Sequence, residues 1–545
     1  MSLAYAAGVV GALLVSLAVA WYADRSREAW GRRLRTRFLL GVPWGTLVSV
    51  GVVLAVYLFV QRGLVHWNDP VTLPFRAWSY LYPVGIVTAA FSHGGPSHLL
   101  GNLTGTLVLA PIVEFAWGHY PSERGSKSFS SWRTNPYVRA FAVFPGAVIG
   151  VGLLTGLFAI GPVIGFSGVV FAFAGFALVH YPLTTVVAAL GVQSVLTRTY
   201  RVVLSPVVTA GTSGSPPGPP WWAEIAIQGH ALGLLIGVLL GVAVAHRRDR
   251  TPGGVRVWFA VLAFAVAQGL WAVYWFRGNG EYVLYQGVGL ALVAALAAVV
   301  TLAVTASERS LPALGGASRR QAAAVVLVVA LAAIAGPAIP VNSLTVAGDG
   351  TPPADRSVAV DGYTVTYAED VRNRMIPAFD VSVFGEDTDV RTSGVIVVNR
   401  DRHIWTRAVS KQRLAYSGSA TVRVGGIDRA TSVEVRRTGW EATGGDAAYQ
   451  VWLRAEGERP RHVYNSSPAT AEPRVRGKNV SVVAREGGGF TLRATEANRT
   501  VAERALPAEN ESVALDDLRI ERRDDALYAV ADGTRVRVAE KERYR

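Results

Sequence analysis

The chain has 545 residues, of which 51% are hydrophobic and 17% are charged, and its mean hydropathy is +0.30. This composition excludes an ordinary soluble protein, and the length excludes a single domain. The net charge of +14 lies mostly in loops between apolar segments, so it indicates membrane topology rather than a nucleic-acid surface. The chain has no cysteine, which excludes a thiol nucleophile, disulfides and cysteine-ligated metal.

Ten apolar runs of about 20 residues are long enough to cross a bilayer. They lie near 3–22, 39–60, 98–118, 138–160, 163–182, 184–205, 224–245, 257–276, 282–305 and 321–341. Loops 24–37, 119–137, 246–256 and 307–320 are basic, so the positive-inside rule assigns them to the cytoplasm. The sequence therefore predicts a multi-pass plasma-membrane protein with the bilayer as its surroundings, with its N-terminus and C-terminal region outside.

Two arginines, Arg198 and Arg201, interrupt the run 184–205. Arginines near the end of a helix can extend to the membrane surface, and this is our first interpretation. A helix that faces a water-filled cavity is the alternative.

The stretch "FSHGGPSHLLGN" brings His93, His98 and Asn102 to the start of the third predicted span. His98 and Asn102 are four residues apart, so they share one helix face. Because polar side chains are costly in lipid, we expect this face to point into the bundle or towards water.

In the stretch "GFSGVVFAFAGF", Gly165, Ser167 and Gly168 form a G-x-S-G string at the start of the fifth span. The glycines allow close approach of another helix or of a substrate. The string alone is compatible with helix packing as well as with catalysis.

The seventh span contains His230 about two turns from its outer end, beside glycines repeated at every fourth position. Gly229, Gly233, Gly237 and Gly241 form one smooth face that can approach the fifth span closely. Such an approach permits a hydrogen bond of about 3 Å between Ser167 and His230.

Together these residues predict a Ser-His dyad, since the spans contain no acidic residue at a matching depth. His230 is the expected general base for Ser167. Asn102, His98 and backbone N–H groups at Ser167 and Gly168 are the expected oxyanion donors. The proposal needs no cofactor and no metal.

These motifs, in this order, resemble those of the rhomboid intramembrane serine proteases. The resemblance rests on H-x-x-x-x-H-x-x-x-N (His93, His98, Asn102), on G-x-S-G and on H-x-x-G-x-x-x-G (His230, Gly233, Gly237). It implies a six-helix protease core at 39–245, hydrolysis of peptide bonds in or beside transmembrane segments of other proteins, and an interfacial loop at 73–84. Phe171 departs from the family, in which a tyrosine commonly stacks on the catalytic histidine.

The remaining segments lie outside the resemblance. One extra span with a basic loop is expected at 1–38, three more spans at 246–341 and a linker at 342–356. Only nine of the 39 acidic residues precede position 345, which supports a boundary there. The segment 357–545 alternates β-branched or aromatic residues with charged ones, so it predicts a β-rich, sandwich-like extracytoplasmic domain. Three kinds of ligand stay open for this domain: the substrate, an envelope component or another partner.

The expected fold is thus an all-α membrane bundle followed by a mainly-β domain. Two functional alternatives stay open. A catalytically silent rhomboid-like protein would bind or escort transmembrane segments, but such relatives typically lack the serine or the histidine. A transporter would be expected to contain internal repeats, which the sequence does not clearly show.

Overall fold

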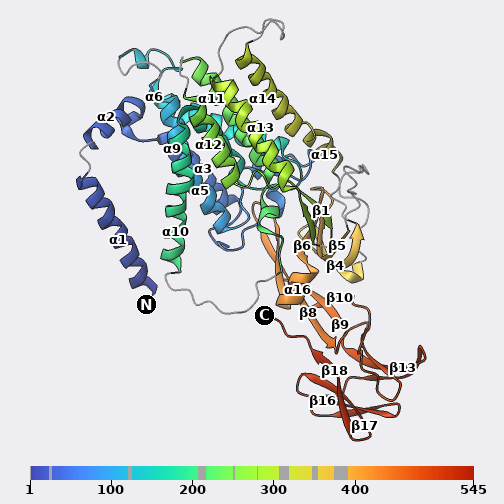
Figure 1. Cartoon of the computed structure of the whole chain (residues 1–545). Coiled ribbons are helices and arrows are strands. Elements are labelled where there is room, and N and C mark those ends of the chain that lie inside the picture. Colours follow the sequence, from blue (N-terminus) through green and yellow to red (C-terminus); the bar gives the residue numbers. More distant parts are fainter. Residues whose placement is uncertain are drawn as a thin grey trace.

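The computed structural model describes residues 2–23, 27–120, 126–205, 217–248, 252–278, 280–305, 318–345, 354–372 and 391–545. A helical region comes first and a β-rich region follows (Figure 1). Among the described residues, six helices are long and apolar enough to cross a membrane: Ala4–Ala23, Pro96–Trp117, Pro136–Phe158, Ile227–His246, Gln286–Thr305 and Arg319–Leu344. The protein is therefore a multi-pass membrane protein, whereas its orientation in the membrane stays a prediction.

The helical region contains, in chain order, α1 (Ser2–Ala23), α2 (Arg27–Arg37), α3 (Trp44–Ala55), α4 (Pro83–Ala89), α5 (Pro96–Trp117), α6 (Pro136–Val138), α7 (Phe144–Phe158), α8 (Ser167–His180), α9 (Pro182–Val186), α10 (Gln193–Leu204), α11 (Ile227–His246), α12 (Gly254–Ala267), α13 (Gln286–Thr305), α14 (Arg319–Ala335) and α15 (Ala338–Leu344). Shorter apolar helices occupy three further predicted spans: Trp44–Val60, Ser167–His180 and Gly254–Ala267. Nine of the ten predicted spans thus contain an apolar helix.

The remaining predicted span, 184–205, the sixth in chain order, is a composite of α9, a π-helical turn (Val187–Val192) and α10. No residue of α10 is buried. Arg198 and Arg201 line a cavity of about 350 Å³ together with Gln193, Ser194 and Gln268. Arg201 is in the last turn of α10, which ends at Leu204, so the position near a helix end and the polar cavity occur together and both interpretations stay open.

The eighth predicted span, 257–276, is wrong in its second half. Helix α12 ends at Ala267, and β1 (Tyr274–Gly278) then pairs with β2 (Glu281–Leu284) in an antiparallel hairpin. Aromatic and β-branched cross-strand pairs, Trp275 with Val283 and Phe276 with Tyr282, favour strands here. The run is apolar, but its residue types and the glycines around its turn favour a hairpin over a helix.

Helix α8 is the buried centre of the helical region. Its residues from Gly168 to Val179 are all buried, and α5 and α11 both pack against it. A helix that is enclosed on every side is apolar all round, as this sequence is.

A buried polar network surrounds Glu114, in the last turn of α5. Its carboxylate accepts hydrogen bonds from the Gly45 N–H (2.7 Å), the Thr46 N–H (2.9 Å) and the Thr46 hydroxyl (2.7 Å). His119 Nε2 lies 2.6 Å from the same carboxylate, while His119 Nδ1 accepts from the Leu39 N–H at 2.8 Å. Every polar group of this network thus has a partner, so α3 and α5 are fixed together.

The predicted mainly-β region is confirmed, and it consists of antiparallel sheets. The described strands form a four-stranded sheet in the order β3-β4-β5-β6, an eight-stranded sheet in the order β10-β9-β8-β18-β17-β16-β15 with β7 paired to β8, and a four-stranded sheet in the order β11-β12-β13-β14. Their bounds are β3 (Ser357–Val360), β4 (Tyr363–Arg372), β5 (Arg391–Asn399), β6 (Ile404–Ser410), β7 (Ser419–Gly425), β8 (Ala430–Ala442), β9 (Ala447–Ala455), β10 (Arg461–Asn465), β11 (Ala469–Thr470), β12 (Asn479–Ala484), β13 (Phe490–Glu496), β14 (Arg499–Ala505), β15 (Ser512–Leu515), β16 (Leu518–Arg523), β17 (Ala526–Ala531) and β18 (Thr534–Lys541).

Two apolar cores lie between these sheets. One contains Val365 and Val397 of the first sheet with Val433 and Val451 of the eight-stranded sheet. The other contains Val482 of the third sheet with Ile520 of the eight-stranded sheet. Helix α15 runs to Leu344, inside the predicted linker, and the domain boundaries themselves stay predictions.

Candidate active site

Ser167 is the first residue of α8, directly after a sharp change of chain direction. Gly165 causes this change, because its φ of +127° is accessible to glycine but strained for other residues. A Cβ atom at Gly165 would also lie 2.5 Å from the His98 ring. The position therefore requires glycine on both grounds, and it brings Ser167 to the N-terminus of a buried helix.

His230 lies opposite Ser167, with its Nε2 atom 2.8 Å from the serine Oγ. Helix α11 begins at Ile227, so His230 is in its first turn rather than two turns inside the span. The Phe171 ring stacks on the imidazole with a centroid distance of 4.2 Å and an interplanar angle of 11°. The imidazole is thus held between a hydrogen bond and an aromatic face.

Small residues bring the two helices together. A Cβ atom at Gly233 would lie 2.0 Å from the Gly168 carbonyl oxygen, and one at Gly237 would lie 2.0 Å from the Ala172 carbonyl oxygen. In contrast, a Cβ atom at Gly229 would meet nothing within 4 Å. Close backbone contact between α8 and α11 therefore depends on Gly233 and Gly237, and this contact sets the distance between Ser167 and His230.

His98 and Asn102 of α5 lie against Gly165, two residues before Ser167. A Cβ atom at Gly165 would meet both side chains, His98 Nε2 at 2.6 Å and Asn102 Nδ2 at 3.5 Å. Asn102 is buried, and its Nδ2 group has no hydrogen-bond partner among the described residues. Its amide donor is therefore free to bind an oxygen atom.

His93 is fully buried and lies beside His98, with a distance of 5.1 Å between the ring centroids. The Phe166 N–H points at His93 Nε2 over 3.5 Å. His93 therefore supports the turn before Ser167, and it lies behind the Ser167–His230 pair.

Two glutamines that the sequence analysis missed hold this region in place. Gln61 is buried, and it accepts from the His93 N–H (2.7 Å) and donates to the His93 carbonyl (2.8 Å). Gln228 donates to the carbonyls of Phe158 (2.8 Å) and Ile334 (2.9 Å), so it links α7 to α14 two residues before His230. Each is a polar residue at one end of an apolar run, which was the only sequence signal available.

A cavity of about 30 Å³ opens beside Ser167 and His230. Its wall is made mostly of alanine and glycine, including Ala89, Ala90, Gly156 and Gly229. This space is large enough for water, because a cavity needs about 10–15 Å³ to hold one molecule.

The arrangement provides the parts needed for nucleophilic chemistry: a hydroxyl, an imidazole within hydrogen-bonding distance of it, and unpaired donors. The first N–H groups of α8 add to these donors, since the first turn of a helix has no intrahelical acceptors for them. The same helix end is electropositive, which favours a developing negative charge.

Comparison with protein-family models matches residues 80–247 to the rhomboid domain. The chain carries a rhomboid domain. This finding confirms the predicted resemblance, and the extra helices and the β-rich region lie outside the match. No curated protein and no solved structure matches the chain.

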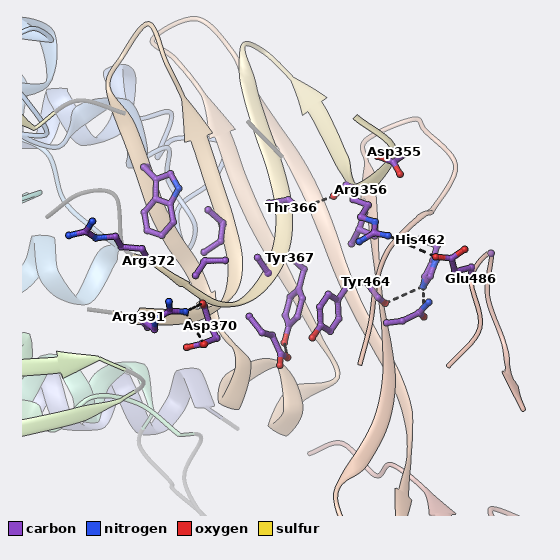
Figure 2. Close-up of a pocket in the computed structure, with 18 residues that line it drawn as sticks. Asp355, Arg356, Thr366, Tyr367, Asp370, Arg372, Arg391, His462, Tyr464 and Glu486 are labelled. Carbon is purple, nitrogen blue, oxygen red and sulfur yellow. Dashed lines mark hydrogen bonds and ion pairs between the residues drawn. The ribbon is translucent and has the colours of Figure 1, made fainter. Parts of the chain in front are cut away.

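A larger cavity, of about 1020 Å³, lies outside the rhomboid domain, between β4 and β10 (Figure 2). Two pairs of its charged side chains contact each other: Arg391 with Asp370 at 2.9 Å, and Arg356 with Glu486 at 3.9 Å. Burial together with the nearby Glu369 carboxylate raises the pKa of Tyr464 to about 12, so this phenol stays protonated at neutral pH. No serine or cysteine is among the residues that line this cavity, which therefore differs in kind from the site at Ser167.

Proposed function

We propose that the rhomboid domain is an intramembrane serine endopeptidase that cleaves transmembrane segments of other membrane proteins. The observation that carries this proposal is the 2.8 Å distance between Ser167 Oγ and His230 Nε2. A hydroxyl is a weak nucleophile unless an adjacent base removes its proton, and this distance is the one that such a transfer needs.

In the first half of the reaction, His230 Nε2 takes the Ser167 proton while Oγ attacks the carbonyl carbon of the scissile bond. The tetrahedral intermediate then collapses, His230 returns the proton to the leaving amine, and an acyl-enzyme remains on Ser167. In the second half, a water molecule gives its proton to His230 and attacks the ester. The acid product leaves and Ser167 regains its proton.

The negative charge on the tetrahedral oxygen requires preorganised donors. We assign this role to Asn102 Nδ2, to His98 and to the backbone N–H groups at Ser167 and Gly168. The unpaired and buried state of Asn102 Nδ2 supports the assignment. Removing one such donor typically lowers the rate by about 100- to 1000-fold.

Phe171 takes the place of the usual stacking tyrosine in this proposal. It stacks on His230 and orients the imidazole without a hydroxyl. The small alanine- and glycine-lined cavity favours a substrate with a small side chain next to the scissile bond.

The test is labelling of the full-length protein, in detergent or liposomes, by a fluorophosphonate, together with cleavage of a reporter that contains one transmembrane helix. We expect Ser167→Ala to abolish both, and His230→Ala to reduce both by at least about 10⁴-fold, as loss of the base does in serine proteases. Ser194→Ala is the matched control, because Ser194 lies on α10 and its hydroxyl donates to the Leu190 carbonyl. Cleavage that persists in Ser167→Ala would refute the dyad.

The same experiment separates the proposal from the silent-protein alternative. If the reporter co-purifies with wild-type protein but remains intact, and Ser167 is not labelled, then the domain binds transmembrane segments without cleaving them. The presence of both Ser167 and His230 favours the enzyme.

A further inference from the structure

The segment 61–82, here called the docking loop, comes early in the chain but contacts the β-rich region in space. Arg62 Nη1 donates to the Asp428 carbonyl at 2.6 Å. Arg423 Nε of β7 donates to Asp69 Oδ2 at 3.0 Å. In the first hydrogen bond the donor is on the loop, and in the second it is on the β-rich region. Both bonds join the loop to β7 and the turn that follows it.

Apolar packing reinforces these contacts. Leu73 and Trp78 of the docking loop belong to the same buried cluster as Val422 and Val424 of β7. The Trp78 side chain is only 1% exposed, and its indole N–H donates to the Leu73 carbonyl at 2.6 Å. The docking loop therefore contributes to the core of the β-rich region instead of only touching its surface.

Helix α15 holds the docking loop from a second direction. The Asn342 carbonyl accepts from the Tyr80 N–H at 3.0 Å and from the Ser79 hydroxyl at 3.1 Å. The Asn342 amide donates to the Ala159 carbonyl at 2.8 Å. The last described helix before the β-rich region is thus tied both to the docking loop and to the segment that leads to Ser167.

At its other end, the docking loop reaches the candidate active site through Gln61. The Gln61 carbonyl accepts from the Val71 N–H at 3.0 Å, and its side-chain amide donates to the Val71 carbonyl at the same distance. The same side chain holds both backbone groups of His93, whose Nε2 faces the Phe166 N–H. A continuous chain of contacts therefore leads from β7 to the residue before Ser167.

We propose that the β-rich region is a positioning element for the candidate active site, and that it acts by holding the docking loop, so that Gln61 fixes His93 and the turn before Ser167. Its effect on catalysis rests on the proposed function, whereas its effect on the docking loop does not. The extra domain is then part of the working enzyme.

The first test is independent of activity. Arg423→Glu places a second carboxylate against Asp69, so the docking loop should be released more often. Exposed ion pairs contribute little individually, so we expect amide hydrogen exchange at Val71 and His93 to become about threefold to tenfold faster. Asp69→Arg combined with Arg423→Glu reverses the pair and should restore the wild-type rate to within about twofold.

Arg454→Glu is the matched control. Arg454 lies on β9 and pairs with Glu434 of β8, an ion pair that includes no residue of the docking loop. The same charge reversal there should leave exchange at Val71 and His93 unchanged. Leu73→Ala, which removes an apolar contact instead of a charge, should accelerate exchange in the same direction as Arg423→Glu.

The second test measures the rate of fluorophosphonate labelling and the separate kcat and KM of reporter cleavage. In Arg423→Glu we expect slower labelling and a lower kcat by about threefold to tenfold, with rescue in the reversed pair. Unchanged exchange at both amides would overturn the proposal, and so would faster exchange with unchanged labelling. If the wild-type protein is not labelled at all, the proposed function fails, while the exchange result still decides whether the β-rich region holds the loop.

Discussion

Helix α5 has a polar cluster at each end, and the two clusters differ in how completely their hydrogen bonds are made. At the Glu114 end, the carboxylate and both nitrogens of His119 have partners, namely backbone N–H groups, a hydroxyl and each other. At the His98 end, Asn102 Nδ2 and His230 Nδ1 are buried without a partner among the described residues. A saturated cluster fixes helices together, whereas unused donors in a buried place are costly unless they serve a ligand or a reaction.

The largest expected effect is at the saturated end. Glu114→Ala would leave the Gly45 and Thr46 N–H groups and His119 buried without their acceptor, and each buried polar group left without a partner typically costs about 1–3 kcal/mol. We expect a large fall in the thermal unfolding temperature in detergent, with activity lost because the fold is lost. If Glu114→Ala were stable but inactive, Glu114 would have a functional role. The contrast between a structural end and a functional end of α5 would then be wrong.

At the other end, Asn102→Ala should lower kcat by about 100- to 1000-fold, because one oxyanion donor is removed. The unfolding temperature should change little, since the Nδ2 group has no partner to lose among the described residues. Kinetics and thermal unfolding measured on the same preparations give the result. A strongly destabilised but active Asn102→Ala protein would mean that Asn102 is structural.

The packing of α8 on α11 provides a third test, with a control on the same helix. Gly233→Ala would place a methyl group 2.0 Å from the Gly168 carbonyl oxygen, so the helices must separate. Overpacking of this kind costs about 1–3 kcal/mol, and labelling of Ser167 should slow as its distance from His230 increases. Gly229→Ala has open space around it and should leave thermal stability unchanged. Equal loss of stability in the two variants would contradict the packing account.

The smallest expected effect concerns Phe171. Phe171→Leu removes the ring that stacks on His230, and aromatic pairs contribute about 0.5–1.5 kcal/mol beyond their buried area, which predicts a loss of about twofold to tenfold in the labelling rate. Phe171→Tyr keeps the ring and should label within about twofold of wild type. If Phe171→Leu were as active as wild type, stacking would not be what orients the imidazole.

The sequence predicted one end of α5 far better than the other. His98, Asn102, Ser167 and His230 carry ordered motifs, and their spacing places them near one another on helices. Glu114 belongs to no sequence motif, and two of its partners are backbone N–H groups, which every residue type except proline provides. Gln61 was missed for the same reason, since its partners are backbone groups of Val71 and His93.

The sequence also did not predict which distant segments contact each other. The pairing of Arg423 with Asp69 joins positions that are 354 residues apart, and neither residue stands out among its neighbours. The β1–β2 hairpin was overlooked because hydropathy does not distinguish an apolar hairpin from the end of an apolar helix. Periodicity identified the β-rich region, but it does not specify which strands pair across such distances.

The small cavity beside Ser167 also has a kinetic consequence. A space of about 30 Å³ has room for water but not for a peptide segment. For the proposed protease, we therefore expect helices to separate before a substrate reaches Ser167, so that an opening step precedes the chemistry. For the proposed protease, turnover then depends on how often the bundle opens, so bilayer thickness and fluidity are expected to change kcat even when the dyad is untouched.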